Sequence, residues 1–265
     1  MKKGIGFLIS LLLLLSACGS VPLTGRKQVL LVSDQEVMSS SLKQYDDYIK
    51  SNTRSSDKAK TDMVVRVGKK IAAATEAYLK ANGMESEIKN FAWEFNLIKD
   101  PQANAFCMPG GKIVVYEGLL PYTPTDDDLA VVIGHEVAHA VAKHSNERMS
   151  QQLMTQYGSS ILGYALNNKS TAVQTLANSV YGLGTQYGIM LPYSRKHEYE
   201  ADYMGLVFMA MAGYNPDAAV TFWEKMSSGA GGKTPEFMST HPSDASRIAE
   251  IKKHLPEVKR LAGKQ

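Results

Sequence analysis

The chain has 265 residues, with 29 lysines and arginines against 26 aspartates and glutamates, for a formal net charge of +3. Because acidic and basic residues are interspersed, without the concentrated basic face typical of nucleic-acid binding, the charge pattern argues against a nucleic-acid partner. The length suffices for one sizeable domain with its own hydrophobic core, and no repeat or long low-complexity region divides it.

The amino terminus has the pattern of an export signal. Met-Lys-Lys precedes a short apolar run, GIGFLISLLLLL, and then the residues Ser-Ala-Cys. Such a run is typical of a secretory signal and not of a membrane span. Leu-Ser-Ala-Cys at 15–18 has the form of a bacterial lipobox, so we expect residues 1–17 to be a signal peptide and Cys18 to be the acylated first residue of the exported protein. The alternative is a simple signal peptide with an incidental cysteine.

Lipidation at Cys18 predicts where the protein resides. Several acyl chains give stable anchoring, so we expect a lipid-anchored protein of the bacterial cell envelope, at the outer membrane and facing the periplasm. Residues 18–33 are then predicted to be a flexible lipidated tether. Cys107 is the one remaining cysteine, so no intramolecular disulfide is expected. We interpret Cys107 as a small, partly buried apolar residue.

Two helices and a small sheet are predicted next. In chain order these are a helix at 34–52, a helix at 57–82, a strand at 91–98, the two strands ANAFCM and KIVVYEG, and a short helical connection at 119–120. Ser33 and Glu36 form a capping box at the start of the first helix. The sequence Pro-Gly-Gly at 109–111 is typical of a hairpin turn between the last two strands.

The following helix carries the most informative motif of the chain. Thr125 is a plausible N-cap before three aspartates, which suit the positive end of a helix dipole. The helix is apolar over most of its first half, so we expect it to be buried, and residues 135–139 within it read His-Glu-Val-Ala-His. His135 and His139 leave the same face and can bind one metal ion. Glu136 can reach a water molecule beside that ion and act as a catalytic base.

Residues 147–191 are predicted to contain two more helical stretches, broken at 167–170. Glutamines spread through both stretches make them too polar to span a membrane. We expect an amphipathic helical hairpin that packs near the cleft. Substrate gating, membrane contact and a plain scaffold all remain open as its role.

A later helix, from residue 194 to Gly213, supplies the acidic partners of the two histidines. Glu198 and Asp202 lie four residues apart and share one face, which is otherwise apolar. Two carboxylates on a buried face need a positive partner, so we assign Glu198 as the third metal ligand and Asp202 as the acceptor of a ligand histidine's free ring N–H. Glu200 points away from this face and is the weaker candidate, and His197 is adjacent but not assigned.

The last part of the chain contains two residues whose roles stay open. A helix is predicted to start at Asn-Pro 215–216, a loop to cover 227–236, and Ser243 to cap a final helix. His241 precedes that helix in a loop; its ring could donate to a developing oxyanion, or it could occupy the open metal position and exclude water. Arg247 could hold a substrate carboxylate or pair with Glu250 or Asp244.

The sequence HEVAH followed by SRKHEYEAD resembles the gluzincin metallopeptidases related to heat-shock protease X and the CAAX prenyl protease, whose pattern is HExxH and, on a later helix, ExxAD. The matching residues here are His135, Glu136, His139, Glu198 and Asp202. The segments at 21–36 and 104–120 are similar to the soluble lipoprotein branch of that family, and the segment at 239–248 also looks like the family. The resemblance implies an α+β, mainly helical, zincin-like domain over residues 34–265, with a small β-sheet beside the HExxH helix.

The resemblance and the expected compartment together predict a function. We expect one zinc ion per chain and a membrane-anchored endopeptidase that hydrolyses unfolded or misassembled envelope proteins. Its substrates would bind extended along an edge strand, for which 103–108 and 112–116 are the two candidates. The alternative is an envelope chaperone or assembly-factor lipoprotein with a latent, autoinhibited protease activity, acting with the envelope assembly machinery.

Overall fold

The structure is a computed structural model, and it describes residues 18–165, 167, 191–228, 235–241 and 245–263. The predicted signal peptide lies outside this part of the chain. So do residues 168–190, the second half of the predicted helical hairpin, and Ser243, the predicted cap of the final helix.

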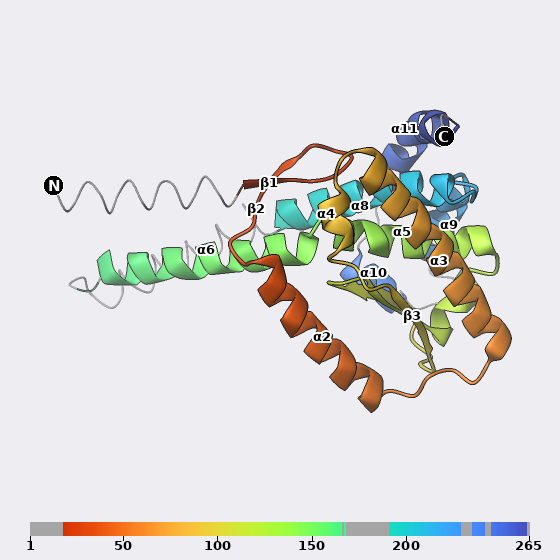
Figure 1. The fold of residues 1–265 in the computed structure, drawn as a ribbon, viewed down its shortest axis with the longest axis horizontal. Coiled ribbons are helices and arrows are strands. Elements are labelled where there is room, and N and C mark those ends of the chain that lie inside the picture. Colours follow the sequence, from red (N-terminus) through yellow and green to blue (C-terminus); the bar gives the residue numbers. More distant parts are fainter. Residues whose placement is uncertain (1–17, 166, 168–190, 229–234, 242–244, 264–265) are drawn as a thin grey trace.

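Helices make up most of the described fold, and the predicted mainly helical α+β class is confirmed (Figure 1). The helices are α2 (Asp34–Ser51), α3 (Lys58–Ala81), α4 (Glu85–Ile88), α5 (Asp126–Val141), α6 (His144–Ala165), α8 (Leu191–Met211), α9 (Ala218–Ser227), α10 (Glu236–Thr240) and α11 (Ala245–Ala262). The strands are β1 (Cys18–Ser20), β2 (Lys27–Val29), β3 (Glu94–Ile98), β4 (Ala105–Met108) and β5 (Lys112–Tyr116), and a 3₁₀ helix, η1, spans Glu117–Tyr122.

A three-stranded mixed sheet lies beside the HExxH helix, as the sequence predicts. Its strand order is β3-β5-β4, with β3 parallel to β5 and β4 antiparallel to it. Helices α3 and α5 pack on the sheet, and residues such as Leu97, Ile113 and Val115 are buried in the shared core. The hairpin of β4 and β5 therefore leaves β4 as the edge strand next to α5.

Side-chain caps fix where the main helices begin. The predicted capping box of Ser33 and Glu36 is present at α2, and Thr125 caps α5 together with Asp128. Such caps satisfy backbone N–H groups that have no partner inside the helix. Helix α5 ends at Val141, and Lys143, with φ 55°, turns the chain into α6. In Figure 1, α6 extends far beyond the rest of the fold.

Some element boundaries differ from those predicted. Strand β3 begins at Glu94 and not at residue 91; just before it, the rings of Phe91 and Trp93 stack on each other with centroids 4.5 Å apart. Helix α9 begins at Ala218, because residues 215–217 form a turn in which the Asn215 side chain accepts from the Asp217 N–H at 3.1 Å. Among the described helices, none is both long and apolar enough to cross a membrane.

Residues 18–33 were expected to be a flexible tether, and the structure corrects this. β1 and β2 form a short antiparallel hairpin, here called the N-terminal hairpin (residues 18–29), and Val21 in its turn is buried in the main core. Arg26, in the same turn, forms ion pairs with Glu147 on α6 and Glu200 on α8, both at 2.7 Å. These buried carboxylates need a cation, which is the physical reason that the segment packs against the domain.

The two helices that carry the HExxH and ExxAD residues touch at a pair of glycines. A Cβ added to Gly205 on α8 would lie 2.8 Å from the carbonyl carbon of Gly134 and from the backbone nitrogen of His135 on α5. A Cβ on Gly134 would lie 2.8 Å from the carbonyl oxygen of Gly205. The backbones of α5 and α8 can therefore approach each other closely, one residue away from the first histidine of the motif.

Substituting Gly205→Ala is expected to push α5 and α8 apart, because the added methyl group meets the rigid backbone of α5 at Gly134 and His135. Overpacking of this kind typically costs about 1–3 kcal/mol, and we expect a loss in that range in the free energy of unfolding measured with urea. Gly263→Ala is the matched control, since its Cβ would have only an ordinary contact of 3.4 Å with the carbonyl oxygen of Lys259. Equal urea midpoints for both variants would contradict a tight helix crossing.

Candidate metal centre

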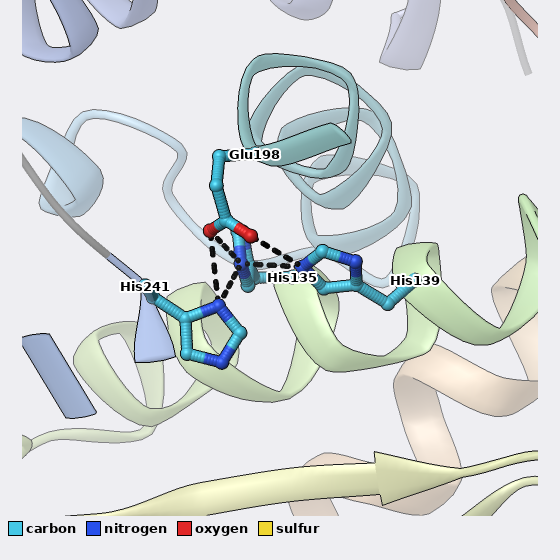
Figure 2. Close-up of side chains that lie close together, drawn as sticks. All are labelled: His135, His139, Glu198 and His241. Atoms are coloured by element: carbon cyan, nitrogen blue, oxygen red, sulfur yellow. Dashed lines mark hydrogen bonds and ion pairs between the residues drawn. The ribbon is translucent and has the colours of Figure 1, made fainter. Parts of the chain in front are cut away.

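Four buried side chains from three helical elements converge on one point (Figure 2). His135 and His139 come from α5, Glu198 from α8, and His241 directly follows α10. The Nε2 atoms of the two α5 histidines are 3.0 Å apart. The Glu198 carboxylate lies 3.2 Å from His135 Nε2 and 3.4 Å from His139 Nε2. The structure thus brings together the three residues that the sequence assigns as ligands.

Asp202 and Arg247 contact the residues of this cluster and hold them in position. Asp202 Oδ1 lies 3.0 Å from His135 Nδ1, the position predicted for the acceptor of a ligand's free ring N–H. Arg247, only 1% exposed, donates to both oxygens of Asp202 and lies 3.3 Å from Glu198. Its guanidinium also stacks over Trp223, 3.8 Å from the ring centroid. The sequence offered a substrate carboxylate, Glu250 or Asp244 as the partner of Arg247. Among the described residues the partner is Asp202, in place of the first two alternatives. Asp244 lies outside the described residues.

Glu136, the neighbour of His135 on α5, lies between the cluster and β4. Its Oε2 accepts from the backbone N–H of Cys107 at 3.0 Å. Within the described part of the chain its Oε1 has no hydrogen-bond partner, although His241 Nε2 lies 3.3 Å away. Burial raises the pKa of Glu136, and it also raises the pKa of the Cys107 thiol well above its usual value. Glu136 is therefore suited to take up a proton, whereas Cys107 is not suited to act as a thiolate nucleophile.

His241 enters the cluster with one ring nitrogen. Its Nδ1 lies 3.1 Å from His135 Nε2 and 2.9 Å from Glu198 Oε2. The sequence left two roles open for this residue. The structure places Nδ1 among the candidate ligand atoms, all of which lie within 4.8 Å of one another.

The charges in the cluster indicate that it suits a cation. Burial lowers the pKa of His139 to about 3. Burial also opposes protonation of His135, but Asp202 and Glu198 outweigh it and raise the pKa of His135 to about 9. Burial would raise the pKa of Glu198, yet the surrounding histidines hold it well below its usual range. Two imidazoles and an ionised carboxylate, with Glu136 Oε1 left over beside them, fit the ligand set of a catalytic zinc site.

A second buried network adjoins the first, and it was not predicted from the sequence. His144, the first residue of α6, places Nδ1 2.7 Å from His139 Nδ1 and Nε2 3.0 Å from Glu200. His197 binds Glu147 at 2.9 Å. Burial would raise the pKa of Glu147, but its hydrogen bonds with His197 and Arg26 outweigh burial and lower that pKa to about 2. Glu200 and His197, which were left out of the predicted ligand set, thus have partners of their own.

A surface pocket opens beside His139. It is lined by residues of α2, of the segment before β3, of β4 and its turn, and of the α5–α6 junction, including Val37, Met38, Phe91, Cys107, Pro109, Gly110, Ala140 and Lys143. Its apolar walls are next to both the metal cluster and the edge strand.

Comparisons of the sequence with known proteins indicate the same class of protein, a metallopeptidase. The model of peptidase family M48 matches residues 66–255. Mitochondrial metalloendopeptidase OMA1 of Schizosaccharomyces pombe is 42% identical over 174 residues, which cover 65% of this chain and 49% of that protein. Human metalloendopeptidase OMA1 is 27% identical over 250 residues (91% and 46%), and the beta-barrel assembly-enhancing protease of Escherichia coli is 30% identical over 175 residues (63% and 35%).

The chain spans less than half the length of each of these three relatives. The family match nevertheless covers more than half of the chain and includes every residue of the HExxH and ExxAD motifs. The resemblance read from those motifs is therefore confirmed at the level of the family. The chain belongs to peptidase family M48, a family of metallopeptidases.

Proposed function

We propose that this chain is a zinc-dependent endopeptidase that binds one zinc ion through His135, His139 and Glu198. The convergence of two imidazoles and one carboxylate from α5 and α8 carries the proposal. The names of the relatives, which are metalloendopeptidases and a protease, support it. A zinc ion in such a site supplies Lewis acidity, which polarises a peptide carbonyl and lowers the pKa of water.

Glu136 is the catalytic base in this proposal. Its Oε2 is held by the Cys107 N–H, which leaves Oε1 to accept a proton from the attacking water and later to deliver that proton to the leaving amine. Asp202 keeps the proton of His135 on Nδ1, so that Nε2 presents its lone pair to the metal. Arg247 holds Asp202 in that position.

We propose β4 as the strand along which a substrate peptide binds. Of the two strands that the sequence offered, β5 is hydrogen-bonded on both sides by β3 and β4, whereas β4 has a neighbour on one side and lies against α5. Main-chain pairing to an edge strand holds a peptide extended with little discrimination between side chains. The pocket beside His139 could then receive an apolar side chain of the substrate.

The substrates proposed are unfolded or misassembled proteins of the bacterial cell envelope. The export signal and lipobox predicted from the sequence support this location, with Cys18 as the lipid anchor and the outer membrane as its site. The name of the Escherichia coli relative, a beta-barrel assembly-enhancing protease, supports a role in quality control beside an assembly machinery. The finer kinship with heat-shock protease X and the lipoprotein branch is part of the same proposal.

Removal of the metal tests the activity. We expect the purified chain to contain about one zinc per molecule, to cleave an unfolded protein such as casein, and to lose that cleavage when a chelator removes the zinc. Adding zinc back should restore it. Metal analysis and a gel-based cleavage assay on the same samples measure both quantities. Cleavage that persists after complete loss of the metal would contradict the proposal.

The position of His241 favours a second candidate function, a chaperone or assembly factor whose protease is latent. With Nδ1 at 3.1 Å from His135 Nε2, the ring would compete with water for a bound metal. If the closed arrangement is populated about ten to one, apparent activity falls about tenfold. His241→Ala is then expected to raise kcat/KM for a peptide by about that factor.

The opposite result for His241→Ala has a defined meaning. Loss of turnover at unchanged zinc content would show that the ring assists the reaction, as a donor to the developing oxyanion. Absence of cleavage in both the wild-type chain and this variant would favour the assembly factor over the protease.

A further inference from the structure

The metal ligand His139 has a neighbour whose role lies outside the mechanism above. The ring of His144 is fully buried and stacks on His197, with centroids 4.1 Å apart. One of its nitrogens faces His139 Nδ1 at 2.7 Å, and the other faces Glu200 Oε2 at 3.0 Å. His144 therefore connects a candidate metal ligand to a carboxylate that is not itself a ligand.

The groups at the two ends of this series of hydrogen bonds determine which atoms donate and which accept. If His139 offers the lone pair of Nε2 to a metal, its proton resides on Nδ1, and His144 Nδ1 must accept it. Glu200 only accepts when ionised, so the proton of His144 resides on Nε2. Each hydrogen bond in the series from His139 through His144 to Glu200 then has one donor and one acceptor.

The N-terminal hairpin holds the far end of this series. Arg26 donates through Nε to Glu200 Oε2 at 2.7 Å, and through Nη1 and Nη2 to both oxygens of Glu147 at 2.8 and 2.7 Å. Thr24 Oγ1 donates to the other oxygen of Glu200 at 2.5 Å. Both oxygens of the Glu200 carboxylate are thus bound by the hairpin, and its orientation towards His144 is set there.

The two α5 histidines are therefore supported by different means. His135 reaches its carboxylate, Asp202, directly at 3.0 Å. His139 reaches Glu200 only through an intervening imidazole. The break at Lys143, with φ 55°, is what turns the first residue of α6 back towards the helix that precedes it.

We propose that His144 is a positioning residue for the metal ligand His139, and that Arg26 of the N-terminal hairpin holds it in place through Glu200. The inference rests on the metal site of the proposed function. It adds that zinc affinity depends on residues 24–26, a segment far from the HExxH motif in sequence. Partners of ligand histidines typically change metal affinity by about 10- to 100-fold when they are removed.

A measurement of zinc affinity in the absence of substrate tests this inference. The full chain and its variants compete with a chromophoric chelator for zinc, and the visible spectrum of each cobalt-substituted protein reports the ligand geometry. We expect His144→Phe, which keeps an aromatic ring but has no acceptor, to weaken zinc binding about 10- to 100-fold and to shift the cobalt spectrum. His144→Asn, whose side-chain oxygen can replace Nδ1 as the acceptor, should lose less.

Arg26→Met tests the hairpin, and Arg66→Met is its matched control. Arg66 forms a comparable two-pronged ion pair with Asp126, at 2.9 and 2.7 Å, on the exposed surface. We expect Arg26→Met to weaken zinc binding by a smaller factor than His144→Phe, and Arg66→Met to leave zinc affinity unchanged.

Three outcomes decide the inference. A folded His144→Phe protein with wild-type zinc affinity and an unchanged cobalt spectrum would overturn it. If His144→Phe does not fold, wild-type zinc affinity in both His144→Asn and Arg26→Met overturns the inference. Weaker zinc binding in Arg26→Met supports the inference, even if His144→Asn binds zinc as the wild type does. A wild-type chain that binds no zinc would overturn the proposed function itself, which separates the two failures.

Discussion

Replacing Glu136 with glutamine is expected to lower kcat/KM for peptide cleavage by about 10²- to 10⁴-fold, the usual contribution of general acid–base catalysis. The amide keeps the shape of the side chain, and its oxygen can still accept from the Cys107 N–H, but it cannot take a proton from water. Zinc content should stay at the wild-type level because Glu136 is not among the candidate ligands. Cleavage kinetics and metal analysis on one preparation measure both effects.

Glu224→Gln on α9 is the control for this substitution. Its carboxylate is exposed and pairs with Lys252 at 3.0 Å, and Glu224 is not among the candidate ligands, so activity should remain at the wild-type level. Wild-type turnover in Glu136→Gln with full zinc occupancy would remove Glu136 from the reaction and leave the metal site without an assigned base.

Arg247→Met is expected to cost about 3–5 kcal/mol in the free energy of unfolding, the range found when one partner of a buried ion pair is removed. The guanidinium is buried between Asp202, Glu198 and the Trp223 ring. Methionine fills much of the space but leaves the two carboxylates without this cation. Urea unfolding of the metal-free protein measures the loss without any contribution from bound zinc.

Arg260→Met on the same helix separates this effect from a general sensitivity of α11. Arg260 is exposed, and surface substitutions usually stay within about 0.5 kcal/mol of the wild type. A loss for Arg247→Met no larger than that of Arg260→Met would mean that the buried carboxylates do not depend on this guanidinium.

The residues that the sequence located are those whose spacing follows the helical period. His135 and His139 lie four positions apart, as do Glu198 and Asp202, so each pair shares a face wherever its helix packs. The capping boxes at Ser33 and Thr125 are equally local, and the structure contains both. The Pro-Gly-Gly turn at 109–111 predicted the hairpin of β4 and β5, although only the pairing with β3 determined which of them lies at the edge.

The residues that the sequence missed depend on contacts between distant segments. Arg26 and Glu147 are 121 positions apart, and Arg247 and Asp202 are 45 apart, so no local pattern links them. The small residues that begin the N-terminal segment suggested flexibility, whereas two buried carboxylates fix it in place. The role of His144 depends on the positive φ of Lys143, and a lysine in the sequence does not indicate that conformation.

The placement of Arg247 on α11 also has a consequence for the timing of activity. Ribosomes make a polypeptide from its amino end, so residues 135–202 emerge before residue 247 exists. During that interval Asp202 and Glu198 lack the guanidinium that holds them in the folded protein. A nascent or truncated molecule that lacks residue 247 therefore carries the HExxH helix without the cation that neutralises these two buried carboxylates.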